Sequence, residues 1–145
     1  MKLERINTGK ISGIIRRAMR DFPEITGAYL FGSALGYFRP DSDIDIALFV
    51  DPELGLDEYA RNMLEGKIAL RLNPINNHIF DLTVVNPENT IFVFRIIKEG
   101  LLLYTGDEDK LYDIVEKVSR DYDEKGFRHR LAMQEILGED VKNDY

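Results

Sequence analysis

The chain has 145 residues, of which 44% are hydrophobic and 31% charged, and it contains no cysteine. Such a composition is typical of a folded domain in aqueous solution, and it excludes disulfides, thiolate metal ligands and cysteine nucleophiles. The formal net charge of -7 repels polyanions, so we expect no stable binding to nucleic acid.

The chain offers no sign of a membrane segment. No apolar run comes near the roughly 20 residues that span a bilayer. The first ten residues, MKLERINTGK, carry charges where a signal peptide needs an apolar core. We therefore expect a cytoplasmic protein.

The first part of the chain predicts a helix and then a strand. Apolar residues recur at helical spacing over 11–22, with Asn7 or Thr8 available as the N-cap. The strand that follows covers 25–33. It contains Gly27, which marks a bulge or a close approach of another element.

A second strand and a second helix come next. Residues 43–50 alternate as a strand, residues 56–72 repeat the helical period, and residues 78–85 form a third strand. We expect the second helix to bury a stripe composed of Leu56, Tyr59, Ala60, Met63 and Leu64.

The last third predicts more helix and a short edge strand. Asn86 is expected to cap a helix that ends just before Gly100, and residues 101–106 form the edge strand. A further helix begins near Asp107 and is expected to break at Gly126, before a more polar final helix. The aromatic residues of these elements are most simply core, including Tyr29, Phe31, Phe92 and Phe94.

The predicted order is α-β-β-α-β-α-β-α-α. Because the first two strands lie close in sequence, with no helix between them, we expect at least part of the sheet to be antiparallel or mixed. The fold class is therefore α/β or α+β, with a mixed sheet flanked by helices.

Three aspartates occupy positions that an ordinary strand avoids. Asp43 and Asp45 alternate with isoleucines and so share one face of the second strand, and Asp81 lies inside the third. If these strands pair, the carboxylates converge and repel one another unless a cation lies among them. Oxygen ligands favour Mg²⁺ or Mn²⁺, and two such ions commonly serve in-line displacement at phosphorus.

Gly32 and Ser33 follow the first strand, where backbone N–H groups and a hydroxyl can bind phosphate. Each feature alone has a plainer interpretation: the DSDID segment can be a turn before an edge strand, and Asp81 can form a salt bridge. His78 and His129 are more often hydrogen-bonded or exposed residues than ligands. The conjunction of Gly32-Ser33 with the three aspartates favours a functional site.

This pattern of Gly32-Ser33, Asp43-x-Asp45 and a later strand aspartate resembles the DNA polymerase β-like nucleotidyltransferase superfamily. The short chain resembles its minimal members, the MNT proteins that are paired with HEPN-domain toxins. The resemblance implies one minimal nucleotidyltransferase domain over 1–145, with a core to about residue 105 and a helical extension from about 106.

The resemblance also implies roles for these residues. Asp43, Asp45 and Asp81 would bind the metal ions, and Asp81 would help to deprotonate the attacking hydroxyl. Gly32 and Ser33 would hold the phosphates of a nucleoside triphosphate, ATP in the first place.

Many relatives carry an arginine just before the loop glycine. This chain has Leu35 there, before Gly36. Arg39 is the candidate that would bind the triphosphate instead, with an ordinary surface role as the alternative.

Three functions are compatible with this pattern. The first is an antitoxin that transfers AMP to a hydroxyl, such as a tyrosine, of a HEPN toxin. The second is a small-molecule nucleotidyltransferase of the antibiotic-modifying kind, and the third is a non-catalytic module that binds the toxin. The sequence leaves open whether the chain forms a homo-oligomer.

Overall fold

The computed structural model describes residues 4–5, 7–32, 37–38 and 42–137. Its centre is a sheet of four strands in the order β5 (Phe80–Val84), β4 (Ile44–Val50), β2 (Ile25–Phe31) and β6 (Leu101–Thr105). β2 runs antiparallel to both of its neighbours, whereas β4 and β5 are parallel. The predicted mixed sheet is thus confirmed, with β6 at an edge as expected.

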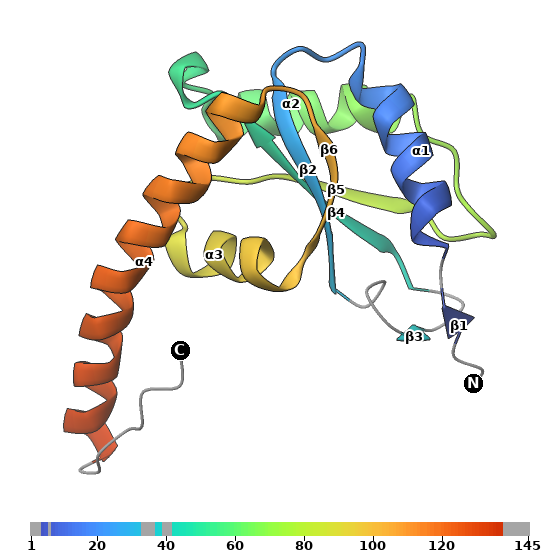
Figure 1. Ribbon diagram of the computed structural model, residues 1–145. Helices are drawn as coiled ribbons and strands as arrows, with labels where there is room; N and C mark the ends of the chain where they lie inside the picture. The colour runs from blue at the N-terminus through green and yellow to red at the C-terminus, as the bar shows by residue number, and fades with distance from the viewer. Residues whose placement is uncertain (1–3, 6, 33–36, 39–41, 138–145) are drawn as a thin grey trace.

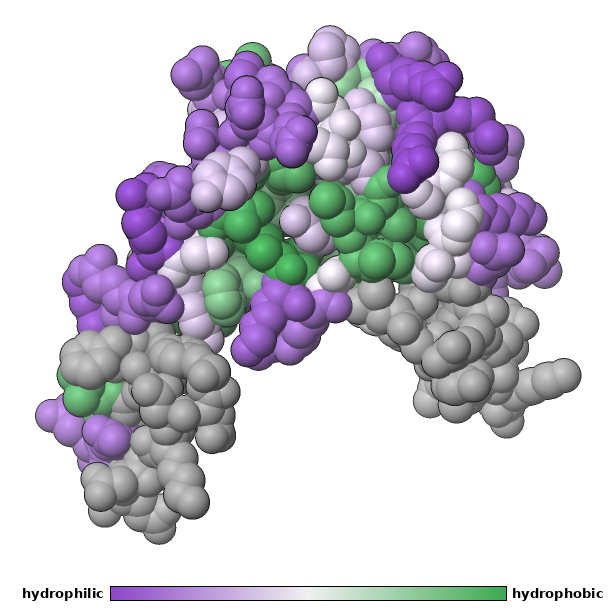
Figure 2. Space-filling view, viewed as in Figure 1, coloured by the Kyte–Doolittle hydropathy of each residue, from purple (hydrophilic) through white to green (hydrophobic). Residues whose placement is uncertain are grey.

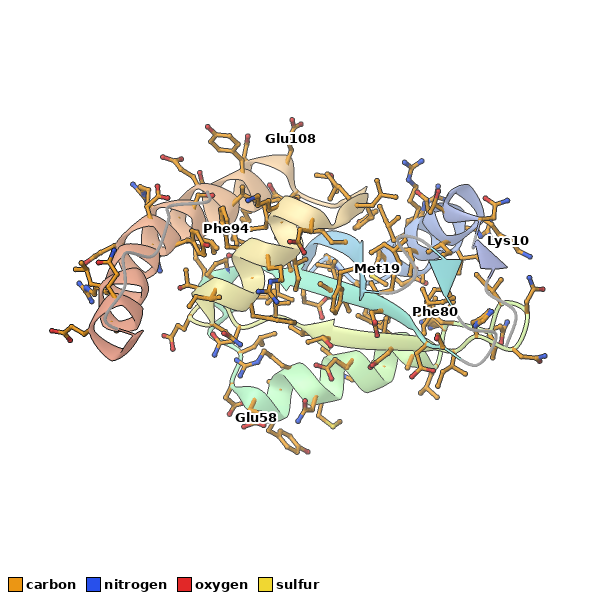
Figure 3. All side chains as sticks on the ribbon, turned by 90° about the horizontal axis from the view of Figure 1, so that it is seen from below. Lys10, Met19, Glu58, Phe80, Phe94 and Glu108 are labelled. Carbon is orange, nitrogen blue, oxygen red and sulfur yellow. The ribbon has the colours of Figure 1, made fainter. Side chains whose placement is uncertain are left out.

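Helices cover both faces of the sheet (Figure 1). One face carries α1 (Thr8–Met19) and α2 (Glu58–Ala69), and the other carries α3 (Thr90–Glu99) and α4 (Glu108–Leu137). Figure 3 shows α2 and α3 on opposite sides of the strands. Because strand side chains alternate, each helix pair packs on its own half of the core.

The first helix follows its sequence pattern closely. Asn7 is the N-cap, and its side chain accepts a hydrogen bond from the N–H of Lys10 at 3.1 Å. Ile11 and Ile15 are fully buried. Apolar side chains at helical spacing together with an N-cap side chain therefore explain where this helix begins and which face it buries.

Gly27 meets both expectations for it. The register of β2 against β4 shifts between Ile25 and Gly27, which is the irregularity of a bulge. A Cβ on Gly27 would lie 2.7 Å from Cδ2 of Leu111, so α4 packs directly on this glycine.

The expected buried face of α2 was wrong in part. Leu64 and Ile68 are buried, whereas Tyr59 is 73% exposed and Met63 is 47% exposed. The buried side chains lie four residues apart, and Tyr59 and Met63 lie beside that line on the solvent side. The helix is anchored by a narrower stripe than the sequence suggested.

Two further expectations also need correction. Asn86 does not cap α3: its backbone oxygen and side chain close a turn with Asn89 and Glu88, and the helix begins at Thr90. Gly126 does not interrupt the last helix, since α4 runs as one helix of 30 residues. One glycine costs about 1 kcal/mol in a helix interior, which a helix of this length tolerates.

Helix side chains satisfy backbone groups of both edge strands. At the β6 edge, Ser12 Oγ and Arg16 Nε donate hydrogen bonds to the carbonyl of Leu103, at 3.1 and 3.3 Å. At the β5 edge, the N–H of Val84 donates to Glu65 Oε1 at 3.0 Å. Each edge is therefore tied to the helix beside it.

A second, two-stranded ladder was not foreseen from the sequence. β1 (Glu4–Arg5) pairs antiparallel with β3 (Tyr37–Phe38), which lies between β2 and β4 in the chain. The ladder joins the start of the chain to the segment that connects these two strands.

Within the described ranges, no helix combines the length and the apolar character needed to cross a membrane.

Candidate active site

Two of the three predicted aspartates lie side by side on neighbouring strands. Asp45 on β4 and Asp81 on β5 are register partners in the parallel pair, and Asp43 comes just before β4 begins. Ala47 and Phe49, two and four residues beyond Asp45, pack among α3 and α4. By alternation, the carboxylates lie on that same face of the sheet, past the end of its apolar core.

The carboxylates act on one another electrostatically. The pKa of Asp45 is raised above 3.8, first by partial burial and then by the negative charges of Asp81 and Asp43. Asp43 and Asp81 themselves are exposed. Burial and like charge thus both disfavour the ionised form of Asp45.

The side chains as placed do not form a closed metal site. Among the described residues, no three His, Asp or Glu side chains are near enough to one another to hold an ion. Metal binding by the three aspartates stays a prediction.

Gly32 brings the backbone against this cluster. It directly follows β2, whose last residue Phe31 pairs with Asp45. Its φ of +74° is in the left-handed region, and a Cβ there would lie 2.4 Å from Asp45 Oδ2. Only glycine fits this conformation and this distance without moving the carboxylate. Ser33 and Arg39, the other predicted phosphate-binding residues, lie outside the described residues.

His78 helps to set the start of β4. It is buried, and its Nδ1 lies 2.7 Å from the carbonyl oxygen of Ser42. Just beyond it, the N–H of Ile44 donates to the carbonyl of Ile79 at 2.8 Å. The prediction that His78 is hydrogen-bonded is confirmed. It holds the segment that carries Asp43.

A cleft of about 320 Å³ opens beside Gly32, between the end of β2 and α3. Phe31 and Phe92 line it with ring centroids 6.0 Å apart, and Arg95 and Glu99 add charges. Phe92 is 38% exposed, so its assignment to the core was wrong. Sequence reasoning missed Arg95, although a lone arginine amid the apolar residues of 91–97 was a visible signal.

Another cleft lies at the far end of β4, around Asp51, Lys110 and Asp113. Asp51 directly follows the strand, six residues after Asp45, and is therefore about 20 Å away from it. This cleft is separate from the carboxylates and from Gly32.

Residues 14–109 match the family model described as "Polymerase beta, Nucleotidyltransferase". The chain belongs to this nucleotidyltransferase family. The matched region contains Gly32 and all three aspartates, and the resemblance seen in the sequence is confirmed. A comparison with curated protein sequences gave no match.

Solved structures with the same fold include antitoxin complexes. A crystal structure of the toxin-antitoxin MntA-HepT matches with a TM-score of 0.58 and 23% identity, covering 89% of this chain and 98% of that one. A toxin-antitoxin crystallised with AMP-PNP matches with a TM-score of 0.58 and 24% identity, covering 91% and 99%. A structure from Shewanella oneidensis has a TM-score of 0.56 and 19% identity, covering 88% and 98%. This nucleotidyltransferase thus shares its fold with them over nearly its whole length.

Proposed function

We propose that this nucleotidyltransferase transfers AMP from ATP to a tyrosine hydroxyl of a HEPN-domain toxin, for which it is the antitoxin. The observation that carries the proposal is the pairing of Asp45 with Asp81 beside Gly32. Family membership gives the reaction class. The likeness to MntA-HepT and to a toxin-antitoxin with AMP-PNP supports the partner and the nucleotide.

In the proposed reaction, the tyrosine oxygen bonds to the α-phosphorus of ATP. The bond from the α-phosphorus to the oxygen that bridges to the β-phosphate breaks, and pyrophosphate leaves. A carboxylate oxygen of Asp81 takes the proton that the tyrosine hydroxyl loses. The backbone at Gly32 and the hydroxyl of Ser33 hold the phosphates, so the protein acts mainly by positioning.

Asp43, Asp45 and Asp81 would hold Mg²⁺ or Mn²⁺, which when bound neutralises phosphate charge and polarises the α-phosphorus. The donor set fits a hard cation because it offers carboxylate oxygens alone. The repulsion that raises the pKa of Asp45 would also be relieved by a cation. Asp43 and Asp81 would turn toward Asp45 to share it.

A similar crystal structure carries substitutions at the same spacing. In one MntA-HpeT complex, two aspartates that lie two positions apart are replaced by glutamate. Asp43 and Asp45 have the same separation.

The test is to incubate the purified chain with ATP labelled at the α-phosphate and with Mg²⁺, with and without a candidate HEPN toxin. We expect label on the toxin, and a loss of about 100-fold or more in rate for Asp45→Asn and Asp81→Asn. Asp113→Asn is the matched control, because this exposed aspartate lies at the far end of the sheet. It should transfer label at the wild-type rate.

Each other result points to a different function. A toxin that binds tightly but stays unlabelled would identify a non-catalytic binding module. Label on small hydroxyl compounds alone would identify a small-molecule transferase. Full transfer by Asp45→Asn would overturn the assignment of the aspartates.

A further inference from the structure

The cleft between β2 and α3 lies on the same face of the sheet as the carboxylates. Phe31 is the register partner of Asp45, and paired residues in a sheet direct their side chains to the same face. The ring of Phe31 meets Phe92 of α3 edge to face. The cleft therefore lies one strand away from Asp45, and Gly32, which lines the cleft, also faces the carboxylate of Asp45.

One face of α3 borders this cleft. Phe92, Arg95 and Glu99 recur at helical spacing and line it together with the buried Ile96, whereas Val93 is buried away from the cleft lining. The side chain of Arg95 is thus held on the cleft side by the packing of its own helix.

The charges in the cleft favour an anion at Arg95. Arg95 is exposed, and within the described part of the chain it makes no ion pair. Of the described residues that line the cleft, it is the one cation, and Glu99 is the one carboxylate. A guanidinium can bind phosphate through two parallel N–H groups. Arg95 is well suited to this role, because it belongs to an acidic protein and lies beside the aromatic side chains of the cleft.

The strand order gives the direction of a bound substrate. The sheet runs from Asp81 on β5, through Asp45 on β4, to Gly32 at the end of β2, and then to the cleft. A nucleoside triphosphate with its α-phosphate at the aspartates and its β-phosphate at Gly32 would place its γ-phosphate at Arg95.

We infer that Arg95 binds the terminal phosphate of the nucleoside triphosphate, and so fills the role for which the sequence offers no arginine before Gly36. This rests on the proposed function, since it requires a triphosphate at the aspartates. Arg95 is a positioning residue here. It distinguishes a triphosphate from a monophosphate and holds the pyrophosphate that leaves.

The test measures binding of α,β-methylene-ATP and of AMP, each with Mg²⁺, by calorimetry. In the methylene analogue, the bond that transfer breaks is replaced by an uncleavable one. For Arg95→Gln we expect the Kd of the triphosphate analogue to rise about tenfold or more and the Kd of AMP to stay within about twofold. Arg95→Lys should recover part of the lost affinity, because it keeps the charge but not the paired donors.

Two neighbours on α3 serve as controls. Lys98→Gln removes an exposed cation of the same helix that does not line the cleft, and its Kd values should match the wild type. Glu99→Gln removes the carboxylate of the cleft and should tighten binding of the triphosphate analogue.

The possible failures are distinguishable. Equal weakening of AMP and of the triphosphate analogue in Arg95→Gln would overturn the inference, because Arg95 would then contact the nucleoside or the α-phosphate. Wild-type affinity of Arg95→Gln for both AMP and the triphosphate analogue would also overturn the inference, but it would leave the proposed transferase function intact. A wild-type protein that binds no triphosphate would overturn the proposed function and this inference together.

Discussion

Replacement of Gly32 by alanine, compared with a control glycine, tests whether transfer activity depends on the contact of residue 32 with Asp45 or on backbone strain alone. The left-handed conformation of Gly32, with φ +74°, costs an alanine about 1–2 kcal/mol. The new Cβ would also lie 2.4 Å from Asp45 Oδ2. That oxygen is the free end of a short side chain, so the carboxylate can turn away at little further cost to stability. A carboxylate that has turned away no longer lies where the reaction needs it.

Gly55 provides the matched control. It has a φ of +57°, and a Cβ there would meet nothing within 4 Å. Gly55→Ala should therefore lose the same 1–2 kcal/mol or so of unfolding free energy, which lowers the melting temperature by about 2–8 °C, and keep its activity. Gly32→Ala should lose a similar amount of stability and also about 100-fold or more in transfer rate.

The assays are urea unfolding for stability and transfer of label from ATP for activity. Both variants must be measured at a temperature at which urea curves show them folded. Wild-type transfer by Gly32→Ala would refute the reasoning, because the contact with Asp45 would then have no consequence. Equal loss of activity in both variants would refute it too, since the effect would come from strain alone.

Three further predictions concern stability. Gly27→Ala should lower the free energy of unfolding by about 1–3 kcal/mol through overlap with Leu111, and in a double-mutant cycle Leu111→Ala should relieve part of that loss; simple additivity would count against the contact. The raised pKa of Asp45 means that the folded protein holds this proton more tightly than the unfolded chain does, so the free energy of unfolding falls as the pH rises from 3.8 through the raised pKa. Asp45→Asn should remove that fall and raise the melting temperature of metal-free protein at pH 7, and a lower melting temperature would contradict the repulsion. Tyr59→Ser should change stability by no more than about 0.5 kcal/mol, whereas Leu64→Ala should cost about 2–5 kcal/mol in the same denaturation assay, and the opposite ranking would show that α2 buries its other face.

The strands and the first helix could be predicted because local signals agreed there. In α1, apolar spacing and the Asn7 cap indicate the same boundary. On β4, the alternation of isoleucine with aspartate determines which side chains share a face. If β4 and β5 are neighbours in the sheet, this alternation brings Asp45 and Asp81 together, as the structure shows.

The errors arose where tertiary contacts decide between local options. Several apolar residues of α2 can form a helical stripe, and only packing on the sheet selects Leu64 and Ile68 over Tyr59. Asn86 can cap a helix or close a turn, and the exit from β5 favours the turn. The cleft at Arg95 could not be foreseen, because it exists only where α3 lies across the end of β2.

The exposed surface bears on how a partner can bind. Figure 2 shows apolar surface in the middle of one face, in the region where Figure 1 draws β6. Leu101 and Leu102 of this strand are 42% and 46% exposed. An exposed apolar edge strand ordinarily invites another chain to add a strand.

In this structure, helix side chains hinder the addition of a strand at both edges of the sheet. A strand added beside β6 would have to displace Ser12 and Arg16 from the carbonyl of Leu103. A strand added beside β5 would have to displace Glu65 from the N–H of Val84. Association with another protein, or with a second copy of the chain, is thereby directed to side-chain surfaces on helices and loops. The same protection lowers the risk that the free chain polymerises through its sheet while no partner is bound.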